Sequence, residues 1–452
     1  MHRRHDALKD VSHLNSAVSR SKLAWQLLRP YGKYWYYQLR PDRRPEYFQS
    51  TWKLPNESLS DSATPVLNPD DTAFVFLPMV DWHVRMQRPQ QLALALARLG
   101  HTCIYVNPHL GCEYRLPYLF DSEPRVGRIS DRIFELHVHL PHEHESHSRS
   151  LRAPEVTRVV DAVAAVMNHY GISNAVQVVS FAKWLDVARV LRAEHEFPLI
   201  YDCHDRWDAF PRIAKEIVAR EGELLAAADH VSFSSDSLRR AVLGPHPEYV
   251  YKSSVIGNAV SARDFTAASG KPRQDSRPTV GYAGALEEWF DVEAVFHAAQ
   301  SLPHCRFEIV GRIECGRLHR LRRLPNVEFA GEVPYRSLPQ FLQRWDAAMI
   351  PFLINRVTST VDPIKLYEYF SIGLPVVATA LPEVSQRYSD LVYVGRNAAE
   401  FTTGVEAALA ESGVFLRQRR REVGGRETWL NRARAMQELS RSLQSRASAT
   451  VA

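Results

Sequence analysis

The chain has 452 residues, of which 45% are hydrophobic and 24% are charged, and its formal net charge is +5. This length allows two or three domains that each bury a core, and the composition excludes the disordered and fibrous classes of protein. The slight basic excess suits an acidic ligand or a membrane surface and does not indicate a nucleic acid partner.

Residues 1–72 show no regular pattern of strands and helices, and we interpret them as an N-terminal extension and linker. The segment 29–52 is crowded with Tyr, Trp and Arg side chains. Aromatic rings beside cations are typical of a membrane–water interface, which predicts peripheral contact with the inner face of the plasma membrane. The alternative is an extension that wraps the next domain and packs its rings on it.

The five cysteines are odd in number and show no C-x-x-C spacing, which is typical of reduced thiols in a cytoplasm. No apolar segment of about 18 residues indicates a transmembrane helix. The basic N-terminus also lacks the apolar core of a signal peptide. We therefore expect a cytoplasmic protein.

Strand-like and helix-like segments alternate between residues 73 and 262, as expected for a doubly wound parallel sheet. The predicted strands are 73–77, 102–106, 176–180, 199–201 and 230–233, and the predicted helices are 88–99, 154–170, 184–194 and 211–228. The segment between 107 and 153 is expected to be irregular. A stretch rich in Ser, Ala, Gly, Lys and Pro near 258–277 marks an interdomain linker.

A second alternation covers residues 278–412 and predicts a second Rossmann-like domain. Its strands are expected at 279–282, 307–310, 327–329, 347–351, 376–378 and 391–394. Residues 413–452 are expected to form a helical tail, which runs from about 415 to 445. The predicted fold class is therefore α/β.

The segment 362–379 reads as a short helix followed by a buried strand. Asp362 is predicted to be the N-cap of this helix, with Pro363 at its first position. Gly373 suits the left-handed stop that ends many helices.

Lys365 places a cation in the first turn of that helix, which the helix dipole disfavours by about 0.3–1 kcal/mol. The placement becomes favourable when an anion such as a diphosphate binds at the helix N-terminus. Glu368 lies on the same face, where its carboxylate can accept hydrogen bonds from a ribose diol. This pattern predicts a nucleotide site, and the alternative is a surface Lys365–Glu368 ion pair.

The K-x-x-E-Y run at 365–369, followed by G-x-P-V-V-A at 373–378, resembles the nucleotide-sugar motif of family 4 glycosyltransferases. The resemblance is to the branch that makes bacterial surface polysaccharides such as teichuronic acid, and it covers residues 73–445. It implies the GT-B fold, in which two Rossmann-like domains face a cleft and a C-terminal helix crosses back. The implied enzyme transfers a sugar from a nucleoside-diphosphate donor to a glycan or lipid-linked acceptor. The nucleotide-sugar is then a substrate, and neither a cofactor nor a metal is expected.

Two segments of the first domain resemble signatures of this family. Trp82 and the run 87–90 resemble W-x-x-x-x-Q-R-P-Q, which implies that Trp82 and Arg88 lie on the acceptor side. The alternative is that the motif only supplies Pro89 to a helix start. The run 137–147 is rich in histidine, but interleaved acids and Pro141 favour a loop over a zinc site.

The run 201–205 resembles the Y-D-x-x-D segment of the branch. The resemblance implies catalytic roles for His204 and Asp205, with the imidazole binding a donor hydroxyl or handling the acceptor proton. A satisfied surface pair is the alternative.

The second domain departs from the broader family around Gly284. The run 281–291 resembles G-Y-x-G-x-x-x-x-W-x-D, but Ala285 and Phe290 stand where broader family 4 places an Arg and a Lys that bind the diphosphate. Lys365 is then the leading candidate for the phosphate charge, and Arg312 is the second.

The E-x7-E motif is also incomplete. Glu368 matches its second glutamate, whereas Thr360 stands at the first, where a hydroxyl contact with the sugar is expected. Tyr335 follows a G-x-x-P turn after a strand and is predicted to contact the nucleobase, although the segment can equally be only a turn.

Three other functions remain open. The missing family residues favour a non-catalytic GT-B binding subunit, and a nucleotide-sugar epimerase shares the two-domain fold. A Rossmann oxidoreductase is disfavoured because no G-x-G-x-x-G follows any predicted strand.

Overall fold

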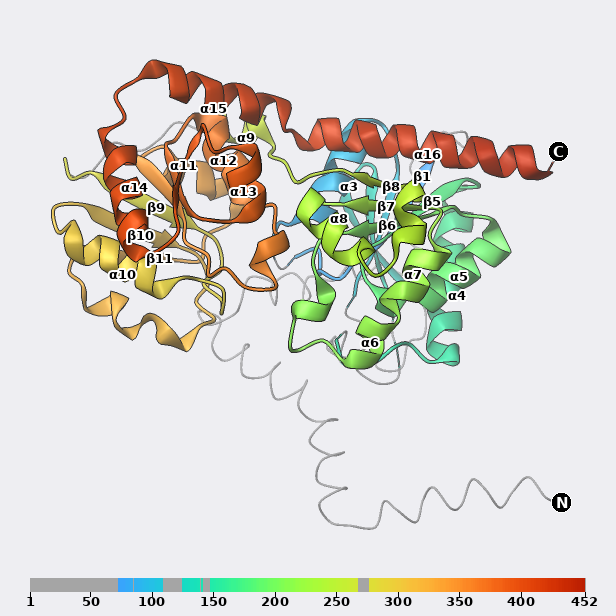
Figure 1. The fold of residues 1–452 in the computed structure, drawn as a ribbon. Coiled ribbons are helices and arrows are strands. Elements are labelled where there is room, and N and C mark those ends of the chain that lie inside the picture. The colour runs from blue at the N-terminus through green and yellow to red at the C-terminus, as the bar shows by residue number, and fades with distance from the viewer. Residues whose placement is uncertain are drawn as a thin grey trace, which may run out of the picture.

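The structure is a computed structural model that describes residues 72–83, 85–108, 124–138, 140, 147–266 and 276–451. Two domains lie next to each other, each built on a sheet that helices cover, and the last two helices of the chain lie along one side, one over each domain (Figure 1). The predicted extension lies outside the described residues except for Thr72, so its membrane contact stays a prediction. Most of the histidine-rich run 137–147 also lies outside them.

The first domain contains an eight-stranded sheet in the order β3-β4-β2-β1-β5-β6-β7-β8. All neighbouring strands are parallel except β3 and β4. The strands are β1 (Ala73–Leu77), β2 (Cys103–Val106), β3 (Arg125–Ser130), β4 (Ile133–His137), β5 (Ala175–Val179), β6 (Leu199–Cys203), β7 (His230–Phe233) and β8 (Ser253–Val255). The central strands β1, β2 and β5 are buried on both faces, which explains their continuous apolar sequences.

In the described part of the first domain, six helices connect these strands: α3 (Arg88–Arg98), α4 (Ala153–His169), α5 (Leu185–His195), α6 (Lys215–Ala219), α7 (Glu221–Ala227) and α8 (Asp236–Leu243). Two predictions were wrong here. The segment expected to be irregular contains the antiparallel pair β3 and β4, and the helix expected over 211–228 is two short helices that meet at Arg220.

The second domain contains a six-stranded parallel sheet in the order β11-β10-β9-β12-β13-β14. Its strands are β9 (Thr279–Ala283), β10 (Arg306–Val310), β11 (Val327–Gly331), β12 (Ala347–Ile350), β13 (Val376–Thr379) and β14 (Val392–Gly395). Its helices are α10 (Val292–Ser301), α11 (Leu338–Leu342), α12 (Ile364–Ile372), α13 (Pro382–Arg387) and α14 (Ala398–Ala410), and the short α9 (Ala262–Thr266) precedes the domain. The strand order reverses between β9 and β12, which is where such sheets bind ligands.

The C-terminal tail is helical and consists of two helices, α15 (Val414–Arg426) and α16 (Trp429–Val451). α16 leaves the second domain and packs along α3 of the first (Figure 1). Trp429, Ala433 and Met436 are buried in the same apolar cluster as Leu92 and Leu96 of α3. The crossing predicted for the C-terminal helix is thus confirmed.

The motif helix α12 begins one residue later than predicted. Pro363 is its N-cap, and the Asp362 carboxylate does not bond to the helix N-terminus. Gly373 adopts the predicted left-handed conformation with φ +79° and ends the helix. The strand β13 follows as expected.

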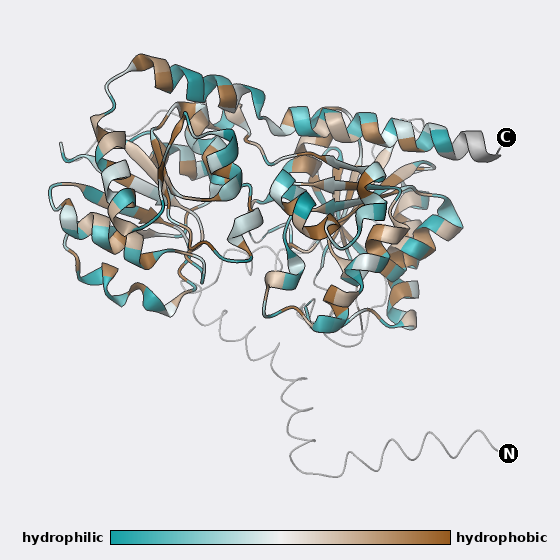
Figure 2. Cartoon of the chain, viewed as in Figure 1, coloured by the Kyte–Doolittle hydropathy of each residue, from teal (hydrophilic) through white to brown (hydrophobic). Residues whose placement is uncertain are grey.

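Hydropathy along the chain follows this architecture. The helices carry hydrophilic and hydrophobic residues on alternate sides, as expected for elements that each bury one face (Figure 2). Among the described residues, no helix combines the length and the apolar content that a membrane span requires.

Candidate active site

A cleft with a volume of ≈ 1550 Å³ lies between the two domains. Loops at the carboxyl ends of β1 and β6 form one wall, and loops after β9, β10, β11 and β12 form the other. All but one of the predicted site residues line it, namely Trp82, Arg88, His204, Asp205, Gly284, Arg312, Tyr335, Lys365 and Glu368; the exception is Thr360.

The half-buried Lys365 extends from the first turn of α12 across the aromatic rings of the second domain. Its ammonium lies 4.6 Å from the ring centre of Phe352 and 5.5 Å from that of Tyr282. Burial lowers the pKa of Lys365 to about 8, although Glu368 and Glu287 oppose this shift. Within the described part of the chain, this ammonium makes no hydrogen bond or ion pair. It is therefore available to a ligand anion.

Gly284 brings the backbone of the loop after β9 against this lysine. Its φ of +149° is a backbone conformation that favours glycine. A side chain would also be crowded, because an added Cβ would lie 3.0 Å from Lys365 Cε and 3.0 Å from the Tyr282 hydroxyl oxygen. Tyr282 holds the loop in place because its hydroxyl donates to the Ala285 carbonyl at 2.8 Å. The loop and the start of α12 both line the cleft beside Lys365.

Glu368 lies one turn further along α12 and is only 5% exposed. Burial raises its pKa to about 7, against the opposing influences of the Tyr335 hydroxyl and the Lys365 charge. The Tyr335 hydroxyl is itself buried beside this carboxylate, and its ring packs edge-on against Phe265. The carboxylate and the phenol thus lie together at the same end of the cleft.

Charged groups of the two walls meet across the cleft. Arg85 from the loop after β1 bonds to Glu287 at 3.1 Å and to Glu314 at 2.8 Å. Arg312 also pairs with Glu314, through Nε at 3.1 Å. Arg312 therefore shares its carboxylate partner with Arg85, and Lys365 is the better candidate for binding phosphate.

His204 and Asp205 both line the cleft on the first-domain wall. His204 Nδ1 lies 3.2 Å from the Asp202 carbonyl, which can only accept, so this nitrogen carries the proton. His204 Nε2 then offers a lone pair, 3.8 Å from the Asp205 carboxylate. Burial and the Glu287 charge raise the pKa of Asp205, while His204 opposes the shift.

Arg88 has a more structural role than the resemblance implied. Its guanidinium is 2% exposed and bonds to both oxygens of the buried Asp202 at 2.8–3.1 Å. It also donates to the Gly257 carbonyl and the Asn258 side chain. These partners use most of its N–H groups, so it is poorly placed to bind an acceptor. Trp82 is buried edge-on against Tyr105 at the cleft floor.

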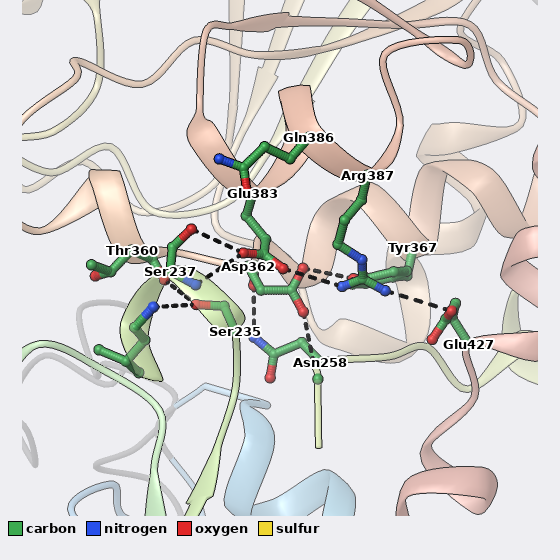
Figure 3. Close-up of polar contacts among 12 residues, drawn as sticks. Ser235, Ser237, Asn258, Thr360, Asp362, Tyr367, Glu383, Gln386, Arg387 and Glu427 are labelled. Carbon is green, nitrogen blue, oxygen red and sulfur yellow. Dashed lines mark hydrogen bonds and ion pairs between the residues drawn. The ribbon is translucent and has the colours of Figure 1, made fainter. Parts of the chain in front are cut away.

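Thr360 faces away from the cleft. Its hydroxyl donates to the Val357 carbonyl at 3.0 Å, and its own carbonyl accepts from Ser235 of the first domain at 2.7 Å (Figure 3). The prediction that its hydroxyl contacts the sugar therefore finds no support in this geometry, because the hydroxyl bonds within its own loop and the carbonyl bonds to the first domain.

The residues beside Thr360 form an interdomain junction (Figure 3). The Asp362 carboxylate accepts from the Asn258 backbone N–H at 2.8 Å and from the Tyr367 hydroxyl at 2.6 Å. Glu383 accepts from the Ser237 hydroxyl at 3.1 Å. The Asp362 carboxylate is thus bonded to the first domain, which explains why it does not cap α12.

Sequence reasoning missed a second histidine on the first-domain wall. His83 lines the cleft and bonds through Nε2 to the buried Glu135 of β4 at 2.8 Å. The two residues are 52 positions apart. The chain pattern gives no sign of their contact, because β4 lies in the segment expected to be irregular.

Comparisons with known proteins agree with this arrangement. Residues 277–411 match the family described as glycosyl transferases group 1. A stretch of 254 residues is 26% identical to TuaH of Bacillus subtilis (strain 168), which bears the name of a teichuronic acid biosynthesis glycosyltransferase. That match covers 51% of this chain and 64% of TuaH, so it spans less than two thirds of the relative.

Solved structures share the fold over most of the chain. Sucrose-phosphate synthase from Thermosynechococcus elongatus is 17% identical with a TM-score of 0.61, and covers 83% of this chain and 99% of its own. A glycosyltransferase from Rickettsia africae ESF-5 is 12% identical with a TM-score of 0.60 over 83% and 99%. The E. coli trehalose-6-phosphate structure bound with UDP-2-fluoro glucose is 12% identical with a TM-score of 0.59 over 82% and 99%.

At such low identities these structures show the fold alone. The chain has the GT-B fold, its residues 277–411 match the glycosyl transferases group 1 family, and about half of it is similar to TuaH.

Proposed function

We propose that this protein transfers a sugar from a nucleoside-diphosphate donor to a surface glycan or a lipid-linked acceptor. The observation that carries the proposal is the pair Lys365 and Glu368, which face the cleft from one turn of α12 and make no ion pair with any other described residue. A buried charge normally requires a partner, so a ligand with complementary groups is expected to supply it.

The donor diphosphate fits the start of α12. The first N–H groups of a helix have no partner within the helix, and the helix dipole adds positive potential there. Lys365 adds a full charge beside these groups, and the glycine loop at 284 allows close approach. Glu368 is then placed to accept hydrogen bonds from the ribose diol, and Tyr335 to contact the base.

In the transfer, the acceptor oxygen forms a bond to the anomeric carbon while the bond from that carbon to the diphosphate oxygen breaks. The diphosphate leaves with the electron pair, so negative charge grows at the helix start. Preorganised donors and cations at such a position lower the barrier to reaction. Because Lys365 supplies this charge, we propose that transfer needs no metal ion, and turnover in a chelator tests this point.

Nucleotide binding is tested first by thermal shift with UDP-, GDP- and dTDP-hexoses. A ligand that binds the folded state raises the unfolding midpoint, and we expect one base series to do so for wild type. Lys365→Ala and Glu368→Gln should each abolish most of that shift. The matched control is Lys252→Ala, which removes a lysine of the first domain that does not line the cleft.

Transfer is tested by the release of nucleoside diphosphate from the donor that binds. Release that depends on an added acceptor supports a transferase, whereas a new free nucleotide-sugar without acceptor supports an epimerase. Binding without any turnover in wild type would contradict the proposed activity and leave a binding subunit. Peripheral membrane contact, proposed for residues 29–52, is tested by sedimentation with anionic vesicles before and after removal of residues 1–71.

A further inference from the structure

His83 and Glu135 form a dyad on the first-domain wall, opposite the proposed donor site. His83 lies in the loop after β1, where its side chain is 25% exposed and lines the cleft. Glu135 lies on β4 behind it and is 2% exposed at the side chain. A buried carboxylate behind an accessible imidazole is an arrangement that orients histidines in enzyme sites.

The network around Glu135 keeps this carboxylate ionised. It accepts from Asn107 at 2.7 Å, and a second histidine, His137, lies 3.2 Å from the oxygen that bonds to His83. Burial opposes ionisation, but His137 and His83 hold the pKa of Glu135 well below its usual range. An ionised carboxylate can only accept hydrogen bonds. The proton of neutral His83 must therefore lie on Nε2.

The other ring nitrogen is left with its lone pair. Within the described residues, His83 Nδ1 makes no hydrogen bond, since the remaining contact of this residue is its backbone N–H to Asp81 at 2.7 Å. Two residues further on, Arg85 crosses the cleft to Glu287, which neighbours the Gly284 loop in sequence. His83 is thus a hydrogen-bond acceptor on the wall that faces the proposed leaving group.

We propose that His83 Nδ1 accepts the hydrogen bond of the acceptor hydroxyl that attacks the donor sugar, and that Glu135 fixes the ring for this role. This inference rests on the proposed transferase function. As the acceptor oxygen bonds to the anomeric carbon and the diphosphate departs, the hydroxyl proton moves to Nδ1. The imidazolium, paired with Glu135, then returns the proton to solvent. Glu135 is a positioning residue, since it acts through His83.

The environment of His83 gives the role a pH signature. The charged groups that face it are Glu135 and His137 on β4 and Asp81 on its own loop. Burial lowers the pKa of His83, but the hydrogen bond and charge of Glu135, with Asp81, raise it above the usual value overall. Turnover should therefore rise with pH as the imidazolium loses its proton. Removing the Glu135 charge should move that rise to lower pH.

The experiment compares wild type, His83→Gln, Glu135→Gln and His246→Gln, with n-octyl glucoside as acceptor and the hexose donor of largest turnover. Gln at position 83 keeps a donor for Glu135, and Asn107 still satisfies that carboxylate, so the fold should survive. His246 pairs with Glu248 at 3.7 Å outside the cleft and is the matched control. Unfolding midpoints and donor-induced shifts are measured for all four proteins.

We expect His83→Gln to bind donor like wild type but to lose about 10²-fold or more in kcat, together with the pH-dependent rise. Glu135→Gln should retain the rise at lower pH, and His246→Gln should match wild type. A His83→Gln variant with wild-type kcat and pH profile would overturn this inference and leave the proposed transferase function standing. Loss of donor binding in that variant would also overturn it, by placing His83 on the donor. A wild type that neither binds nor turns over any donor overturns the proposed function and this inference with it.

Discussion

The Lys365 side chain passes directly beside Gly284, so a β-carbon at position 284 would lie 3.0 Å from Lys365 Cε and 3.3 Å from Nζ. Gly284→Ala should therefore displace the ammonium and weaken donor binding. The positive φ adds backbone strain of about 1–3 kcal/mol to the folded state. Calorimetric titration and urea unfolding measure the two effects. Gly316→Ala, which meets no atom within 4 Å, is the control and should leave both unchanged.

The protonation of Lys365 predicts how donor binding depends on pH. Its pKa is lowered from 10.5 to about 8 in the folded protein. The unfolded chain therefore binds more protons between these values, and this group makes the ligand-free fold more stable as pH rises through that window. Binding of a diphosphate needs the charged form, so affinity for a UDP-hexose should fall as pH rises past about 8.

Titration calorimetry of wild type and Lys365→Met from about pH 6.5 to about pH 8.8 checks this prediction. The methionine variant should bind weakly, with no decline in this range. An equal decline in both proteins would show that another group controls it.

The buried pair of Arg88 and Asp202 should contribute to folding rather than to substrate contact. Arg88→Ala leaves the buried Asp202 carboxylate without its cation. Removing one partner of a buried ion pair lowers the free energy of unfolding by about 3–5 kcal/mol. Urea unfolding should show this loss. Arg128→Ala removes an exposed ion pair with Asp131 and should change stability by less than about 1 kcal/mol. A stable Arg88→Ala variant with impaired acceptor use would instead restore the role implied by the family signature.

Asp362 should couple the unfolding of the two domains. Asp362→Ala leaves the Asn258 N–H and the Tyr367 hydroxyl without their acceptor, a cost of about 1–3 kcal/mol for each buried group that stays unsatisfied. Asp362→Asn keeps one acceptor oxygen and should lose less. Unfolding curves followed by tryptophan fluorescence and by circular dichroism should separate in the alanine variant. Coincident curves with wild-type stability would contradict this role of the junction.

Local chemistry made most of the fold predictable. The central strands are long apolar runs, and Gly373 ends its helix as glycine at a left-handed position does. Lys365 and Glu368 could be placed together because helical spacing alone puts them on one face. The strand order that brings Gly284 beside them follows from the alternating pattern, since loops at the carboxyl ends of such strands converge.

The errors arose where a distant partner decided the local structure. Asp362 is a good N-cap by type, but Asn258 and Tyr367 take its carboxylate. Thr360 points away because its carbonyl bonds to Ser235. The helical tail is divided at Thr428, which pairs with Val260 in the segment between the two domains. Glu135 could not be linked to His83 because nothing in its own segment signals β4.

The position of α16 has a practical consequence for dissecting the protein. Part of the first domain's core comes from the far end of the chain, since Trp429, Ala433 and Met436 pack there. A fragment that stops after the first sheet would expose this apolar face to water and is expected to aggregate. The domains are therefore separable in space but not as contiguous fragments of the polypeptide, and a circular permutant that places α16 ahead of β1 is the rational form in which to isolate the first one.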